Sequence, residues 1–253
     1  TLFSIIAIYG YYEWLTICNT SKYNIYFFLT LTMLFMGLLL TYNNHSIVLV
    51  FAYFSILIWI VMLLDLLLNL NIYKKLLSLN SSIMGLVFIV TTWFLFVSLG
   101  STNNTEIFSY NYLLFSHSEL SDLNKYYLFL ISIVSLTDIS GYFVGKTIGK
   151  NSLCPSISPK KTVEGFVGSL IIPLIIAFVL FNFIFSIPIL ISDVLFMLLC
   201  CIFCTVGDLS VSVYKRFHDV KDSGNILPGH GGILDRLDSY LPTISILHIW
   251  LFL

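Results

Sequence analysis

Residues 47 to 70 read IVLVFAYFSILIWIVMLLDLLLNL, a run in which Asp65 is the only charged side chain. About 20 consecutive apolar residues are enough for a helix to cross the hydrocarbon core of a bilayer. Soluble domains of ordinary composition do not carry runs of this kind. The stretch therefore predicts a membrane-spanning helix, and it sets the fold class of the chain.

The rest of the chain has the same character. Of its 253 residues, 58% are hydrophobic and 10% are charged, and the mean hydropathy is +0.96. Because lipid offers no hydrogen-bond partners to an open backbone, we expect an all-α polytopic bundle with no strands in its core. Residues 1–253 are predicted to form a single membrane domain, with N-terminal helices at 1–125 and the half that carries the site at 126–253. Together with 47–70, the apolar runs predict about eight spans (seven to nine); the other runs are 2–18, 25–41, 82–99, 126–144, 167–187, 191–206 and 241–253.

The few charges are distributed unevenly between the connecting loops. The formal net charge is −1, which gives no electrostatic reason to bind nucleic acid. Basic loops alternate with non-basic ones, and the two largest basic segments are 145–166 and 207–240. By the positive-inside rule, both face the cytoplasm and can share one site.

Glu13, Asp65 and Asp138 are acidic residues within apolar runs, where an ionisable group is by default functional or paired. Asp138 is the strongest functional candidate, because small residues and Lys146 follow it closely in the sequence. For Glu13 and Asp65 the sequence leaves two interpretations open, a functional group or an internally hydrogen-bonded or snorkelling carboxylate.

The segment SPKKTVEGFVG, residues 158–168, pairs two lysines with a predicted helix start near Thr162. A free helix N-terminus beside Lys160 and Lys161 can bind an anion such as phosphate. The alternative is that these lysines only follow the positive-inside rule.

The segment 207–238, GDLSVSVYKRFHDVKDSGNILPGHGGILDRLD, holds nine of the 25 charged residues and is predicted to be the reaction site. A helix continuing through residue 217 would place four polar side chains on one stripe. A glycine-rich turn around His230 follows, and His230 is open to two roles, proton carrier or hydrogen-bond donor to phosphate. A second short helix would bring Asp235 and Asp238 together beside Arg236. The four residues of the stripe are Asp208, Ser212, Lys215 and Arg216.

The donor types in this segment favour a particular metal. Asp208 and Asp235 supply hard oxygen ligands without soft donors, which suits Mg²⁺ better than zinc or copper. A divalent ion on nucleotide phosphates, with Lys and Arg on the remaining oxygens, is the equipment for phosphoryl or nucleotidyl transfer. The residues alone therefore predict a cation-dependent phosphate site at the membrane surface.

The same residues resemble a known family. SVYKR at 212–216, KDSG at 221–224 and PGHGGILDRLD at 228–238 are similar to the signature of the phosphatidate cytidylyltransferase (CDP-diacylglycerol synthase) family. Residues 138–146 and 158–165 resemble its upstream elements in the right order. The first of these blocks reads Asp-Ile-Ser-Gly-Tyr where the family often has Asp-Ser-Gly-Ala-Tyr, which leaves the roles of Ser140 and Gly141 open.

The resemblance implies a nucleotidyltransferase of phospholipid biosynthesis that converts CTP and phosphatidate into CDP-diacylglycerol and pyrophosphate. It implies Mg²⁺ on Asp208 and Asp235, with a second cation left open, and a homodimer in contact with membrane lipid. The expected location is a bacterial-type inner membrane, with the site facing the cytoplasm. The catalytic residues would be Asp208, Lys215, Arg216, Asp235 and Asp238, and the substrate-binding residues Asp138, Lys160, Lys161, Ser212, Lys221, Asp222, His230 and Arg236.

Other classes of protein stay open at this point. A dolichol kinase-like enzyme or an ether-lipid cytidylyltransferase would also need a metal and basic loops. A secondary transporter would explain acidic residues inside apolar runs, but the chain has no convincing internal repeat.

Overall fold

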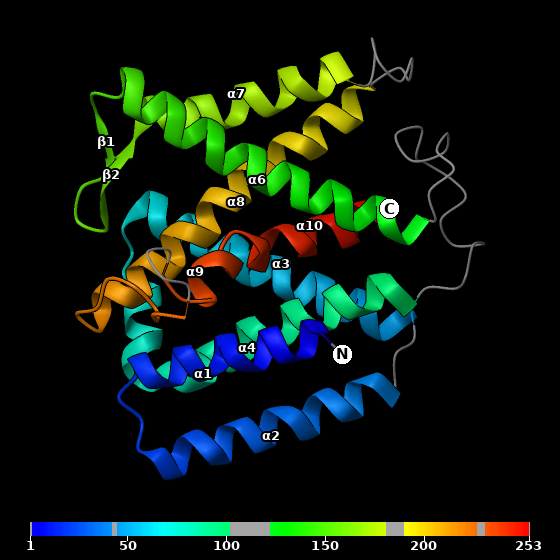
Figure 1. The fold of residues 1–253 in the computed structure, drawn as a ribbon, viewed down its shortest axis with the longest axis vertical. Helices are drawn as coiled ribbons and strands as arrows, with labels where there is room; N and C mark the ends of the chain where they lie inside the picture. The colour runs from blue at the N-terminus through cyan, green and yellow to red at the C-terminus, as the bar shows by residue number, and fades with distance from the viewer. Residues whose placement is uncertain (1, 42–44, 102–121, 181–189, 227–230, 253) are drawn as a thin grey trace.

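The computed structural model describes residues 2–41, 45–101, 122–180, 190–226 and 231–252. These residues form a bundle of helices that lie alongside one another, with a small β-hairpin at one end (Figure 1). The helices are α1 (Leu2–Ile17), α2 (Lys22–Thr41), α3 (His45–Leu68), α4 (Ile72–Ser101), α6 (Asp122–Ile148), α7 (Val163–Val179), α8 (Ile191–Phe217), α9 (Leu234–Leu237) and α10 (Tyr240–Phe252). The hairpin consists of the antiparallel strands β1 (Ser152–Cys154) and β2 (Ser158–Thr162).

Each predicted apolar run coincides with a helix of the described part of the chain. Five of these helices, α2, α3, α4, α6 and α8, are long and apolar enough to cross a membrane. The shorter apolar helices α1 and α7, together with α10, correspond to the remaining runs, although residues 181–187 of the run 167–187 lie outside the described residues. The chain is therefore an all-α, polytopic integral membrane protein, as predicted. The two strands lie between α6 and α7, at the end of the bundle and outside its core (Figure 1).

Helices α8 and α4 extend furthest beyond the apolar runs that predicted them. Helix α8 continues past residue 206 to Phe217, so that its last turns carry the polar stripe out of the apolar region. Helix α4 begins at Ile72 and contains a kink at Asn80, where φ is −162° and ψ is 92°. Asn80 Oδ1 accepts a hydrogen bond from the Ile83 backbone N–H at 3.1 Å and so caps the apolar part of the helix.

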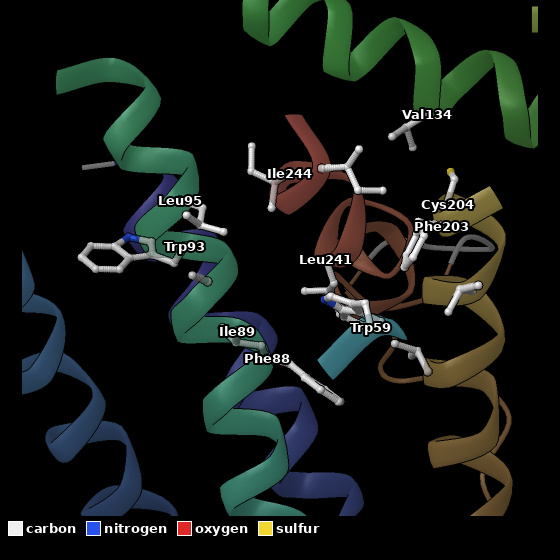
Figure 2. Packing of buried hydrophobic residues seen from close by; sticks show 14 of the residues in the cluster. Trp59, Phe88, Ile89, Trp93, Leu95, Val134, Phe203, Cys204, Leu241 and Ile244 are labelled. Carbon is white, nitrogen blue, oxygen red and sulfur yellow. The ribbon is translucent and has the colours of Figure 1, made fainter. Parts of the chain in front are cut away.

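The core lies where α3, α4, α6, α8 and α10 meet (Figure 2). Phe88 and Ile89 of α4 face Leu241 of α10 and Trp59 of α3, and Phe203 of α8 packs on the other side of α10. All five side chains are at most 5% exposed. Burial of such side chains stabilises a fixed arrangement of α8 and α10, the two helices that flank the polar segment of the chain.

The polar end of α8 is fixed against α1 and α4. The Tyr214 ring stacks on Trp14 at 3.7 Å between ring centroids, and the Tyr214 hydroxyl donates to the Trp14 carbonyl at 2.6 Å. Trp14 Nε1 in turn donates to the Ser81 carbonyl of α4 at 2.8 Å. These buried contacts hold the last turns of α8, and hence the residues that they carry, in one orientation.

Most of the basic residues gather at one end of the bundle. Lys22 opens α2, and Lys74 and Lys75 lie in the first turn of α4. The hairpin with Lys160 and Lys161 and the segment that follows α8 lie at this same end (Figure 1). The alternation of basic loops predicted from the sequence thus corresponds to a one-sided distribution in the fold.

Candidate active site

A cavity of about 750 Å³ opens at the basic end of the bundle, between α6, the hairpin, α7, α8 and the α9 segment. It brings together nine of the predicted site residues from the two basic segments and from α6. Its lining contains five carboxylates, Asp138, Asp208, Asp222, Asp235 and Asp238, and five cations, Lys146, Lys160, Lys161, Lys215 and Arg236. Neutral groups from the lipid-facing helices, including Tyr142, Phe166 and Ser169, complete the wall. A cavity with both signs of charge can hold a metal ion and phosphate groups together.

Asp235 is held by a cation and by the backbone. Lys215 Nζ donates to Asp235 Oδ1 at 2.6 Å, and the N–H groups of Ser223 and Gly232 donate to Oδ2 at 2.9 and 3.0 Å. Burial alone would raise the pKa of Asp235, but these hydrogen bonds outweigh it and bring the pKa below its ordinary value. Asp235 is therefore an ionised carboxylate at neutral pH, fixed opposite the end of α8.

The turn that precedes α9 requires a glycine. Gly231 has a φ of +84°, and a Cβ at this position would lie 2.6 Å from Asp235 Oδ2. Only glycine adopts this conformation without strain and leaves the space for the carboxylate.

Asp208 and the hairpin form the second charged contact. Lys161 on β2 makes an ion pair with Asp208 Oδ2 on α8, and both side chains are 28% exposed. Ser212, one turn further along α8, donates weakly to Asp208 Oδ1 at 3.4 Å. The two basic segments of the chain therefore meet at this pair.

Asp138 and Asp238 also line the cavity, within electrostatic reach of Asp208. Asp238 is 8% exposed and accepts a hydrogen bond from the Ser239 N–H at 2.7 Å. Burial, and then the neighbouring Asp208 carboxylate, raise the pKa of Asp238 well above its ordinary value. The cavity thus contains carboxylates in opposite environments, one stabilised as an anion and one destabilised.

The hairpin is positioned by contacts at its base. Thr162 is the N-cap of α7, and its hydroxyl accepts from the Gly165 N–H at 3.0 Å. Glu164 accepts from the backbone N–H groups of Lys150 and Asn151, at 3.0 and 3.2 Å, where the chain leaves α6. The predicted helix start near Thr162 is confirmed, and it places the two lysines on the strand that enters the helix.

Four predicted site residues are not part of the cavity lining in the described residues. Ser212 acts on Asp208, as above, and Lys221 is exposed. Arg216 Nε donates to the Ile157 carbonyl at 3.2 Å and Nη1 to the Val220 carbonyl at 3.1 Å, so it ties α8 to the hairpin and to the following loop. His230 lies outside the described residues, and its predicted role stays a prediction.

Glu13 and Asp65 both prove to be hydrogen-bonded carboxylates. Asp65 accepts from the N–H groups of Ile72 and Tyr73, at 2.8 and 3.1 Å, at the start of α4. Glu13 reaches from α1 to the loop before α9 and accepts there from Ser223, Ile233 and Leu234. Its link to the cavity was not predicted, although its place inside an apolar run was a signal that it needs partners.

The donor chemistry of the cavity fits Mg²⁺, because its carboxylates are hard oxygen ligands. Within the described residues, no group of three or more His, Cys, Asp or Glu side chains is arranged to hold a metal ion. Asp208 and Asp235 are each neutralised by a lysine instead. A cation bound by both aspartates must therefore share or displace the ammonium groups of Lys161 and Lys215.

The fold and the cavity define a polytopic membrane protein with a charged pocket at one end of its helical bundle. The chain belongs to the cytidylyltransferase family, whose model matches residues 1–253.

Three curated relatives are named phosphatidate cytidylyltransferase. The Bacillus subtilis protein is 48% identical over 140 residues, which cover 53% of this chain and 52% of the relative. The Staphylococcus saprophyticus protein is 48% identical over 127 residues, or 50% of this chain and 48% of the relative. The Staphylococcus aureus protein (strain COL) is 46% identical over 143 residues, or 54% and 53%. The aligned part of the chain thus spans about half the length of each relative.

Proposed function

We propose that this protein transfers CMP from CTP to phosphatidate, giving CDP-diacylglycerol and pyrophosphate for phospholipid biosynthesis. The observation that carries the proposal is the charged cavity in a chain of the cytidylyltransferase family. In this cavity, Lys161 on the hairpin pairs with Asp208, and Lys215 on α8 pairs with Asp235. The names of the relatives support the same reaction.

The cavity suits one soluble and one membrane-bound substrate. Lys160 and Lys161 on the hairpin and Lys215 on α8 offer ammonium groups to the triphosphate of CTP. Tyr142 and Phe166, from the apolar helices α6 and α7, line the same space and can contact the glycerol and acyl part of phosphatidate. Lys146 is then available to the lipid phosphate.

In the proposed reaction, a phosphate oxygen of phosphatidate attacks the α-phosphorus of CTP. A new P–O bond forms as the bond between the α-phosphorus and the bridging oxygen breaks, and pyrophosphate leaves with that electron pair. The phosphate oxygen is already anionic, so no covalent enzyme intermediate is needed. Catalysis consists of positioning and charge neutralisation, which Lys161, Lys215 and Arg236 supply.

Asp208 and Asp235 would hold Mg²⁺, with Asp138 and Asp238 available to a second cation. When bound, the metal would neutralise the phosphates and stabilise the leaving pyrophosphate. Lys215, hydrogen-bonded to Asp235, lies where it can keep an anion beside such an ion.

The proposal includes the location and the assembly of the protein. The one-sided basic residues support an orientation in which the cavity faces the cytoplasm, where CTP is soluble. The bacterial relatives favour the inner membrane. A homodimer is proposed from the family resemblance alone, and cross-linking in native membranes tests it.

The decisive experiment incubates the purified protein with phosphatidate and α-³²P-labelled CTP, with and without Mg²⁺, and identifies the product by mass spectrometry. Labelled CDP-diacylglycerol formed only with Mg²⁺ is the expected result. Transfer of a phosphate group alone would indicate a kinase, and the absence of any product that depends on CTP would contradict the proposal. Archaeal ether lipid in place of phosphatidate distinguishes the related cytidylyltransferase activity.

A further inference from the structure

Glu13 is a buried carboxylate of the first helix, and it binds a part of the chain more than 200 positions away. Its side chain is 3% exposed. Oε1 accepts from the Ile233 N–H at 3.0 Å, and Oε2 accepts from the Leu234 N–H at 2.8 Å and from the Ser223 hydroxyl at 2.9 Å. A buried carboxylate with three donors is costly to disturb, because each donor would lose its partner.

Glu13 and Asp235 divide the donors of one loop between them. Ser223 gives its hydroxyl to Glu13 and its backbone N–H to Asp235. The backbone N–H groups of residues 232 to 234 are divided in the same way. The Gly232 N–H donates to Asp235, whereas the Ile233 and Leu234 N–H groups donate to Glu13. The position of Asp235 relative to Lys215 therefore depends on a carboxylate that does not line the cavity.

The loop is packed tightly around this carboxylate. A Cβ on Gly224 would lie 2.6 Å from Glu13 Oε1, and one on Gly232 would lie 2.4 Å from Oε2. The glycines allow the backbone to surround the carboxylate from two sides. Glu13 therefore packs tightly between α1 and the loop, and a movement of its side chain would displace the loop.

We infer that Glu13 is a positioning residue for the transfer reaction. It acts through Ser223 and the start of α9 to hold Asp235 against Lys215, and it touches neither substrate. The inference rests on the proposed function for its kinetic part and on the geometry alone for its structural part.

The kinetic test compares Glu13→Gln with Asp65→Asn. Both side chains accept two consecutive backbone N–H groups at a helix start, but the Asp65 contacts are at α4, away from the cavity. An amide in place of Glu13 leaves one backbone N–H without an acceptor. We expect kcat to fall about 10- to 100-fold, the usual loss when a supporting residue is removed. KM for CTP should change less than about threefold, because the hairpin lysines are not touched.

The structural test follows hydrogen exchange in the metal-free protein. Glu13→Gln should selectively increase exchange of the N–H groups at residues 231–235, while the α8 and α10 core stays protected as in the wild type. Asp65→Asn should leave residues 231–235 unchanged. If the wild-type protein makes no CDP-diacylglycerol, the proposed function fails, and this exchange measurement alone decides the inference.

Three results would overturn the inference. The first is a Glu13→Gln variant whose kcat stays within about twofold of the wild type. The second is an equal loss of kcat in Asp65→Asn, which would indicate a general effect of removing a helix cap. The third is equal deprotection of the loop and the bundle core, which would mean that Glu13 only stabilises the fold.

Discussion

Asp235 and Asp238 are three positions apart in the chain, yet their surroundings shift their pKa values in opposite directions. Asp235 faces an ammonium group and two backbone N–H groups, whereas Asp238 is buried beside other carboxylates. Carboxylates whose environments separate their pKa values in this way are characteristic of functional sites. At the scale of single residues, the cavity thus stabilises the anionic form of one aspartate and destabilises that of another.

Replacing either predicted metal ligand should abolish most of the activity. Asp235→Asn removes the charge that fixes Lys215, and Asp208→Asn removes the partner of Lys161. Each variant should lower kcat by about 10²- to 10³-fold, as expected for a group that stabilises the transition state electrostatically. Formation of CDP-diacylglycerol at saturating Mg²⁺ is the measurement. Asp219→Asn, which keeps a side chain suited to the positive φ at this turn, is the matched control and should be active. Near-normal turnover in both cavity variants would refute the assignment.

The raised pKa of Asp238 predicts a dependence of stability on pH. Because the folded protein favours the protonated carboxyl, the unfavourable contribution of Asp238 appears as pH rises from the ordinary value of about 3.9 toward the raised folded value. Asp238→Asn removes this effect. The free energy of unfolding of the variant should therefore increase relative to that of the wild type as pH rises, with a limiting slope of about 1.4 kcal/mol per pH unit, and its melting temperature should rise relative to the wild type.

Thermal unfolding of both proteins in detergent between pH 5 and 8 provides the measurement for Asp238. The stability contribution of Asp235 should depend on pH in the opposite direction, because the pKa of Asp235 is lowered in the folded protein. This contribution is fully present above the pKa of the unfolded state and is lost only as pH falls through the pKa of the folded state. Asp235→Asn should not gain on the wild type over the same range. A constant difference between Asp238→Asn and the wild type would contradict the assigned environment.

At the scale of elements, the site depends on the last turns of α8, on the hairpin and on the short segment around α9. Helix α8 carries the polar stripe because it continues beyond its apolar run, and a sequence pattern based on hydropathy ends where the lipid-facing residues end. The hairpin was not predicted as strands, since its pairing is short and its lysines belong equally to a loop. The contacts that bring these elements together are long-range, and a local pattern contains no information about them.

Gly231 tests the turn before α9. Gly231→Ala must adopt a positive φ, which costs about 1–2 kcal/mol, and its methyl group would push against Asp235. We expect both a lower melting temperature and a loss of activity. Gly37→Ala on α2 meets no atom within 4 Å and should be neutral or slightly stabilising. Equal behaviour of the two variants would show that the turn is not constrained as described.

Thr162 tests the junction between the hairpin and α7. Thr162→Ala removes the oxygen that accepts from the Gly165 N–H and should destabilise the protein by about 1 kcal/mol. Thr162→Ser keeps the cap and should differ little from the wild type. Because Thr162 follows Lys161 directly, the alanine variant should also raise KM for CTP, measured in the same assay. A stable and fully active alanine variant would mean that the cap is dispensable.

At the scale of the whole molecule, the sequence predicted the membrane class and the joining of two basic segments, because hydropathy and charge act over long stretches of chain. It also predicted Asp208, Asp235 and Lys161 as site residues from their chemical type, and the structure places all three in one cavity. It could not show that Arg216 turns toward the hairpin or that Glu13 reaches the α9 loop. Both contacts depend on packing between helices that are far apart in the chain.

The one-sided charge predicts the topology of the protein. In a background in which the half-buried Cys18 and Cys154 are replaced by Ser, Lys150→Cys on the exposed hairpin side should react with a membrane-impermeant maleimide in inside-out vesicles and not in intact cells. Thr41→Cys, at the other end of α2, should show the reverse pattern. Labelling of both positions from one side would contradict the proposed orientation.

The hydrogen bond between Glu13 and Ser223 connects residues that are 210 positions apart in the chain. A ribosome adds about 5–20 residues per second, so the loop that donates hydrogen bonds to Glu13 is synthesised about 10–40 s after the first helix. During this time the nascent protein has an unmatched acidic group near the lipid surface, which insertion factors or water must shield. Formation of this contact is therefore a late event in the biogenesis of the protein, and a ribosome-stalled chain that ends before this loop should be inserted in the membrane but should lack the proposed activity.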